Sequence, residues 1–239
     1  MYQDIRLFYG MKIGASDGLI GHLKDFYFDE QSWMLRYIVA DTGSWLPGRQ
    51  VLLTHHAFAP DAFSSALTSD RVLHARLTRK QIEDSPSVDT HRPVSRQYED
   101  DYHRYYGWPT YWQDAGLSGV AGIPAPTPPP AAAGPTRHGH NQRDDIHLFS
   151  TASVAGYQIQ ATDRPAGAVR SFMVDGKTWE IREISVDSGH WYSVRKILIL
   201  PDNVERISYE DSTVYLNLSS EDILQTRNNE VAQACPGRP

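Results

Sequence analysis

Apolar and polar residues alternate with a period of two over long parts of the chain, which predicts β-strands rather than helices. In the first such run, 20–28, the period places four side chains on one face: His22, Lys24, Phe26 and Phe28. After a turn at 29–32, the alternation resumes at Trp33, Leu35, Tyr37 and Val39. The two runs together predict a β-hairpin.

A second hairpin is predicted further along the chain. Its turn contains Asp175-Gly176, a strong tight-turn signal because glycine accepts a positive φ without a Cβ clash. Shorter strands are expected at 51–54, 72–77, 196–200 and 213–218. Their spacing is typical of small closed or nearly closed β-barrels.

The sequence repeats itself with a spacing of 146 residues. Segments 15–53 and 161–199 align without a gap, and thirteen of their 39 pairs are identical, which is far more than unrelated segments share. The identical pairs include Asp17/Asp163, Gly21/Gly167, Asp29/Asp175, Arg36/Arg182, Asp41/Asp187, Trp33/Trp179, Trp45/Trp191 and Arg49/Arg195. Each glycine of the repeat is expected where the backbone bends or another strand approaches closely.

The match continues on both sides with a spacing of 141 residues. Upstream, DIRLF at 4–8 corresponds to DIHLF at 145–149, and downstream 72–82 parallels 213–223. Each copy is expected to end with a strand, a cap at Thr78 or Ser219, and a short turn of helix. A copy is therefore about eighty residues long.

The first copy carries four sequence features that resemble the PRC-barrel family. They are the G-x-L-x-D-F strand at 21–26, the turn at Asp29, the W-x-x-R-Y-I-V strand at 33–39 and the G-R-x-V-L-L strand at 48–53. The second copy departs from the pattern with Ser193-Val194 in place of Pro47-Gly48, and with Glu183 in place of Tyr37. The resemblance covers 4–82 and 145–223, about two thirds of the chain.

This resemblance implies two tandem small PRC-type β-barrels with short helical turns, within a mainly β protein. We expect the first barrel at 1–84, a linker at 85–143, the second barrel at 144–226 and a tail at 227–239. The family includes the cytoplasmic barrel of the photosynthetic reaction-centre H subunit and a domain of ribosome-maturation factors. What such a resemblance carries over is a fold, and this fold serves docking and scaffolding roles more than chemistry.

The linker predicts one short aromatic-rich helix, at about 95–106. Ser95 is a suitable N-cap, Tyr98, Tyr102 and Tyr105 share one face, and Gly107 and Pro109 end the helix. Seven aromatic residues are the candidate partner-binding positions: Tyr98, Tyr102, Tyr105, Tyr106, Trp108, Tyr111 and Trp112. The alternative is that they pack against a barrel. The Pro/Ala/Gly-rich stretch 115–137 reads as a spacer.

Composition and charge narrow the class of protein. The formal net charge of −6 and the lack of a basic stripe make nucleic acid an unlikely partner, although modest acidity is also ordinary for a bacterial-type protein. The chain has no apolar run long enough to be a transmembrane segment, and its N-terminus lacks the pattern of a signal peptide. Its one cysteine, Cys235, excludes an intrachain disulfide. We therefore expect a cytoplasmic protein.

The sequence offers few candidates for chemistry. His55-His56 would point to opposite faces of a strand, and His138 and His140 lie at the end of the spacer, so no metal site is expected. The repeated Arg36/Arg182 and Asp41/Asp187 are expected to form ion pairs within each barrel rather than a binding site, and the repeated tryptophans to pack. No nucleophile elbow, phosphate loop or zinc motif occurs, so neither a catalytic residue nor a cofactor is expected.

Two functions remain in view from these residues. The first is a non-enzymatic binding or assembly module that docks a protein partner or associates with itself as a homodimer. The alternative is a small-molecule binder or weak enzyme with a pocket between the two barrels, lined by the linker aromatics. The sequence does not identify the partner or ligand.

Overall fold

A computed structural model describes residues 2–68, 70–85, 96–108, 148–188 and 195–223 of the chain. It divides the chain into two compact units, one made of Met1–Arg92 with His147–Pro239 and the other of Pro93–Ile146. The first unit is mainly β and contains both copies of the repeat. The second unit contributes one helix, α3 (Arg96–Tyr106), and is considered by itself below.

The first copy has six strands and two short α-helices. Its strands are β1 (Tyr2–Asp4), β2 (Lys12–Ala15), β3 (Gly18–Asp29), β4 (Leu35–Asp41), β5 (Gln50–Thr54) and β6 (Val72–His74). The helices are α1 (Ala62–Thr68) and α2 (Arg79–Glu83), with 3-10 turns η1 (Ile5–Leu7) and η2 (His55–Ala57). The predicted hairpin is β3–β4, and its turn is held by Asp29, whose Oδ1 accepts from the backbone N of Gln31 and Ser32.

The second copy contains the remaining seven strands. They are β7 (Leu148–Ser150), β8 (Gln158–Gln160), β9 (Pro165–Asp175), β10 (Glu180–Ser188), β11 (Arg195–Ile199), β12 (Val204–Ser208) and β13 (Thr213–Leu216). One short helix, α4 (Thr151–Val154), and one 3-10 turn, η4 (Pro201–Asn203), complete its described elements. Its hairpin turn is held by Asp175, which accepts from the backbone N of Lys177.

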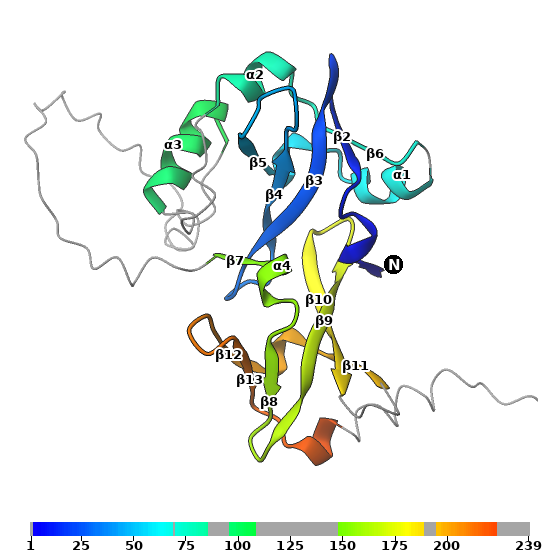
Figure 1. The fold of residues 1–239 in the computed structure, drawn as a ribbon, viewed down its shortest axis with the longest axis vertical. Coiled ribbons are helices and arrows are strands. Elements are labelled where there is room, and N and C mark those ends of the chain that lie inside the picture. The colour runs from blue at the N-terminus through cyan, green and yellow to red at the C-terminus, as the bar shows by residue number, and fades with distance from the viewer. Residues whose placement is uncertain (1, 69, 86–95, 109–147, 189–194, 224–239) are drawn as a thin grey trace, which may run out of the picture. The chain divides into compact units, whose positions relative to one another are not determined.

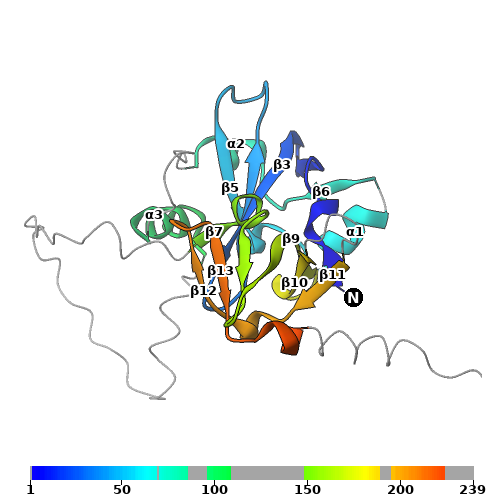
Figure 2. The ribbon, with the colours of Figure 1, turned by 60° about the horizontal axis from the view of Figure 1, so that its bottom comes forward.

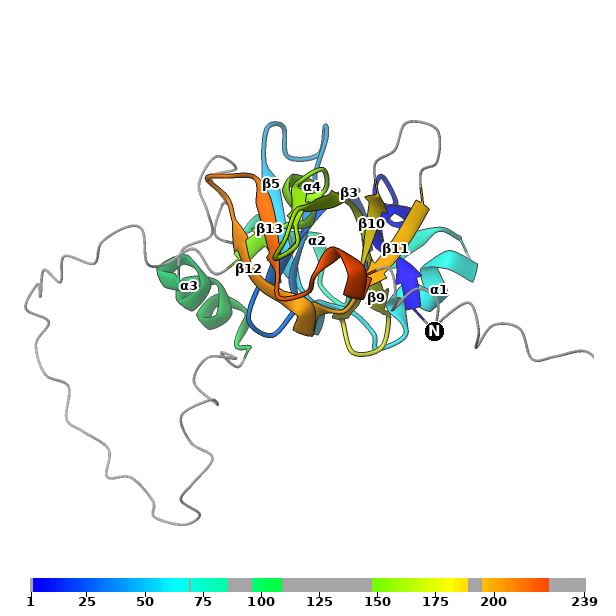
Figure 3. The same cartoon turned by 90° about the horizontal axis from the view of Figure 1, so that it is seen from below.

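The two copies place their strands in the same order. One sheet runs β5-β4-β3-β2-β6 and the other β11-β10-β9-β8-β13, with β12 added at its end. The parallel pair has the same register in both, Lys12 opposite Val72 and Gln158 opposite Thr213. Figure 3 shows the second sheet strongly curved, with β12 and β13 on one side and β10 and β11 on the other. The predicted spacings of 146 residues in the hairpins and 141 downstream are those of the structure.

Each copy gives its first strand to the sheet of the other copy. β1 pairs with β9, where Tyr2 lies opposite Asp175, and β7 pairs with β3, where Leu148 lies opposite Asp29. Figure 1 shows β7 lying beside β3. Both pairs have the same register when 146 is added to each number of the first copy and the partners are exchanged. The exchange is therefore reciprocal.

The two hairpins also meet directly, through backbone hydrogen bonds related in the same way. Leu35 N donates to Trp179 O at 2.7 Å, and Ile181 N donates to Trp33 O at 2.8 Å. Phe28 of the first copy and Phe172 of the second lie with ring centroids 5.5 Å apart. Burying a ring of this size contributes roughly 1.5–3 kcal/mol. The copies thus share one core rather than standing as independent barrels.

The upstream alignment of DIRLF with DIHLF is wrong. In the structure Asp4 lies opposite Met173 and Ser150 lies opposite Tyr27, so the spacing of 146 continues to the first strand of each copy. Asp4 is equivalent to Ser150 and not to Asp145. The short shared string misleads because strand pairing, not identity over five residues, fixes which positions are equivalent.

The assignment of His22, Lys24, Phe26 and Phe28 to one face is also wrong. Phe26 and Phe28 are fully buried, whereas His22 and Lys24 are exposed. A register shift between Leu23 and Asp25 explains the difference, because a β-bulge inserts one residue and reverses the alternation.

The closed barrels expected from the sequence are not confirmed. In the part of the chain that the structure describes, both sheets are open, since β5 and β6 form the two ends of the strand order in one and β11 and β12 in the other.

The copies differ most after β5 and β11. The first copy forms helix α1, which Figure 2 shows beside β6, whereas the second copy continues with η4 and β12. Phe63 of α1 packs at ring-centroid distances of 4.5 Å from Phe8 and 4.3 Å from Trp179.

Candidate functional site

Helix α3 carries the aromatic residues predicted as a binding surface. It occupies Arg96–Tyr106 and is followed by Gly107 in the left-handed conformation at φ +67°, so the predicted helix and its end are confirmed. Tyr106 and Trp108 stack with ring planes 12° apart and centroids 4.4 Å apart. Tyr102 lies 4.9 Å from the Tyr106 ring and is fully buried.

Tyr105 differs from its neighbours on α3 because it remains 42% exposed. Its ring lies 4.8 Å from that of Tyr106 in an edge-to-face arrangement. Tyr105, Tyr106 and Trp108 therefore form a continuous aromatic surface, which we call the α3 aromatic cluster. The side chain of Tyr98, and all of Tyr111 and Trp112, lie outside the described residues.

The exchange of first strands creates two polar junctions. At the first, the half-buried carboxylate of Asp25 on β3 accepts from Ser150 Oγ at 2.5 Å and from Thr151 Oγ1 at 3.0 Å. It also accepts from the backbone N of Ala152 at 3.0 Å, and so caps helix α4 of the other copy. Tyr9 O–H shares a 2.8 Å hydrogen bond with Thr151.

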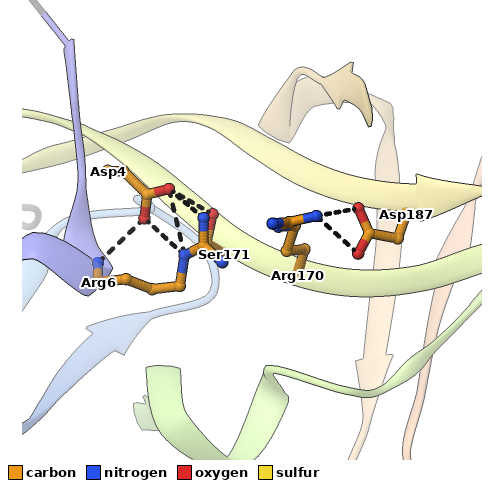
Figure 4. Close-up of polar contacts among 5 residues, drawn as sticks. All are labelled: Asp4, Arg6, Arg170, Ser171 and Asp187. Atoms are coloured by element: carbon orange, nitrogen blue, oxygen red, sulfur yellow. Dashed lines mark hydrogen bonds and ion pairs between the residues drawn. The ribbon is translucent and has the colours of Figure 1, made fainter. Parts of the chain in front are cut away.

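At the second junction the capping carboxylate belongs to Asp4 on β1. It accepts from the backbone N of Arg6 at 3.0 Å, pairs with the Arg6 guanidinium at 2.7 Å and accepts from Ser171 Oγ at 3.2 Å (Figure 4). Arg170 Nη1 contacts both carboxylate oxygens of Asp187, at 3.0 and 3.1 Å, as Figure 4 also shows.

The two carboxylates titrate in opposite directions. Burial raises the pKa of Asp25, and the hydrogen bonds from Ser150 and Ala152 offset only part of that effect. Burial also acts to raise the pKa of Asp4, but hydrogen bonds from the side chain and backbone of Arg6 outweigh it and lower the pKa. Burial raises the pKa of Tyr9 to about 12.

These perturbed groups were not predicted as functional residues. A raised carboxyl pKa beside a buried tyrosine is a pattern found in active sites. Here each hydrogen bond to Asp25 holds the start of α4 against β3, which accounts for the arrangement structurally. The residues lie 125 or more positions apart in the chain, so no local sequence signal could have brought them together.

The predicted pairing of Arg36 and Arg182 with Asp41 and Asp187 requires correction. Arg36 lies 3.8 Å from Asp29, and Arg182 lies 2.8 Å from Glu180. The loop carboxylates take other roles, because Asp41 accepts from the backbone N of Gly43 at 2.9 Å and Asp187 pairs with Arg170.

The repeated tryptophans pack, although to different degrees. Trp179 is buried beneath Phe58 and Phe63, whereas Trp33 is half-buried on Phe28, at a centroid distance of 5.4 Å. Trp45 is half-buried under the Arg79 guanidinium, and Trp191 lies outside the described residues. Both Trp33 and Trp179 have a positive φ, of 56° and 62°.

His55 and His56 do not point to opposite faces. They lie in the 3-10 turn η2, not in a strand, and their ring centroids are 4.0 Å apart. Within the described ranges no three His, Cys, Asp or Glu side chains come together as metal ligands. His138, His140 and Cys235 lie outside those ranges. Across the same ranges, every helix is too short or too polar to cross a bilayer.

Asp17 and Asp163 perform the same task in both copies. Asp17 accepts from the backbone N of Arg79 at 2.7 Å, and Asp163 accepts from the backbone N of Ser220 at 2.8 Å. Each carboxylate therefore holds the helical turn that ends its copy. The identity of this pair in the repeat is explained by capping, with no need for a binding role.

Comparison with known proteins adds no relative to these observations. No protein-family model matches the chain, and no curated protein matches it.

Proposed function

We propose that this protein is a non-enzymatic binding or assembly module that docks a protein partner through the α3 aromatic cluster. The observation that carries the proposal is the 42% exposure of Tyr105 beside the stacked Tyr106 and Trp108. Tyrosine and tryptophan dominate the energetics of protein interfaces because they combine large apolar area with a polar atom. The single cysteine suits the reducing cytoplasm, where we place the protein.

We also propose that the two copies are tandem members of the PRC-barrel family. The matching strand order of the two sheets supports a common fold, as do the equivalent turn carboxylates Asp29 and Asp175. An experimental structure tests this assignment, because a PRC-type barrel requires strand order and closure beyond the open sheets described above.

Site-specific photo-crosslinking tests the docking surface. A photoreactive phenylalanine analogue replaces Tyr105 in the full chain, which is then irradiated in a lysate of the source organism. We expect a discrete adduct that excess unlabelled wild-type protein suppresses and the Tyr105→Lys variant does not. The matched control places the analogue at Tyr209, which is 67% exposed on the other compact unit. An adduct of equal yield from Tyr209, or suppression by Tyr105→Lys, contradicts the proposal.

A further inference from the structure

The two polar junctions use the same pair of residue types with the sides exchanged. Asp4 and Ser150 occupy equivalent positions on β1 and β7, 146 residues apart, and so do Asp25 and Ser171 on β3 and β9. At the second junction Asp4 faces Ser171, and at the first Ser150 faces Asp25. Each junction thus contains one aspartate and one serine.

One carboxylate is what each junction needs. The chain makes a helical turn directly after β1 and after β7, and the first backbone N–H groups of such a turn lack partners within it. Asp4 supplies the acceptor for Arg6 N, and Asp25 supplies the acceptor for Ala152 N. The serine at each junction donates its hydroxyl to that same carboxylate.

Pairing of like copies would break this arrangement. If a first copy exchanged strands with another first copy, Asp4 would face Asp25, and two carboxylates would share one partly buried site. If a second copy met another second copy, Ser150 would face Ser171 and the helical turn would lose its capping carboxylate. Only a first copy with a second copy places one carboxylate at both junctions.

We propose that this aspartate–serine exchange determines the specificity of the interface between the copies. Asp4, Asp25, Ser150 and Ser171 make the first copy accept a second copy and reject another first copy. The rule concerns surfaces and not chain connectivity. The interface therefore also fits a second copy of this chain, whose halves would exchange in a swapped dimer.

Two full-length variants with opposite defects test the rule in trans. S150D/S171D places two carboxylates at each junction within its own chain, and D4S/D25S leaves none. The two proteins are unfolded together, refolded as an equimolar mixture and analysed by light scattering and native mass spectrometry. We expect a heterodimer of twice the 27.0 kDa chain mass, because each junction of the mixed dimer regains one carboxylate. Separate monomers in the mixture, or homodimers equal in yield, would overturn the proposal.

A single-chain rescue keeps the test decisive if either variant folds poorly. S150D alone should lower the thermal midpoint by at least about 4 °C, because a second carboxylate meets Asp25. The exchanged pair D25S/S150D should recover most of that loss, since it reproduces at the first junction the arrangement of Asp4 and Ser171. A merely structural role for the wild-type residues predicts that the double variant is at least as unstable as the two single variants combined.

Discussion

Two glycines bring neighbouring strands closer than any other residue permits. Gly21 has φ +152° and Gly167 has φ +137°. A Cβ built on Gly21 would lie 1.9 Å from the carbonyl oxygen of Asp41, and one on Gly167 would lie 2.3 Å from that of Asp187. The obstacle is backbone in both cases, so the strands themselves would have to separate. This close approach is the one expected from the repeated glycines.

Alanine at either glycine should destabilise the protein strongly. We expect Gly21→Ala and Gly167→Ala each to lower the free energy of unfolding by at least about 2 kcal/mol, through backbone strain and the clash. Urea denaturation measures the loss. Gly48→Ala is the matched control, because Gly48 has φ +75° with nothing within 4 Å of its Cβ position, and should cost only about 1 kcal/mol. Equal losses at all three positions would remove the close-approach argument.

The acid-side stability of the protein should depend on Asp163. Hydrogen bonds from the side chain and backbone of Ser220 lower the pKa of Asp163 below its ordinary value of 3.8. The carboxylate therefore stabilises the fold at pH values above 3.8, and this contribution is lost as the pH falls through the folded-state pKa. We expect Asp163→Asn to be less stable than wild type at pH 7, with the difference shrinking toward pH 3. A difference in urea midpoint that is constant between pH 7 and 3 contradicts this expectation.

At the scale of elements, the short helix that ends the first copy is held by a capping box. Thr78 Oγ1 accepts from Gln81 N, and Gln81 Oε1 accepts from Thr78 N. Thr78→Ala should lower the free energy of unfolding by about 1 kcal/mol in urea denaturation. Lys80→Ala in the same helix removes only an exposed contact with Asp84, and should cost less than about 0.5 kcal/mol.

Helix α1 makes the environments of the two equivalent tryptophans unequal. Trp179 is 4% exposed and contacts Phe58 and Phe63, whereas Trp33 is half-buried. We expect Trp179→Ala to cost about 3–5 kcal/mol and Trp33→Ala clearly less, because the second cavity is partly open to water. Both residues have a similar positive φ, so backbone strain cancels in the comparison. Equal costs in chemical denaturation would contradict the unequal packing.

The hairpins and their turns could be predicted because their signals are local. Alternation marks β3 and β4, and Asp29 and Asp175 form the turns through their own neighbouring N–H groups. The exchange of β1 and β7 could not be predicted, since a three-residue strand carries no pattern that selects its partner. The α3 aromatic cluster follows from tyrosine spacing, whereas the junction at Asp25 depends on residues brought together by that exchange.

At the scale of the whole molecule, the connection between the copies is separate from the contacts that join them. The copies meet through β1 with β9, β7 with β3, the crossing hairpins and the shared aromatic core. None of these contacts involves the intervening chain between α2 and β7. The unit that holds both copies should therefore survive a break in that chain.

Cleavage of the connecting chain tests this independence directly. A protease site inserted at 131–133, in the Ala-rich part of the spacer, allows the chain to be cut after folding. We expect the fragments to elute together in size-exclusion chromatography, and their thermal midpoint to become dependent on concentration because unfolding now separates two molecules. The same cut in a variant lacking residues 1–4 is the control, since β1 and one polar junction are then missing and the fragments should separate more readily on dilution. Immediate separation of the fragments with β1 intact would show that the connection, rather than the exchanged strands, holds the copies together.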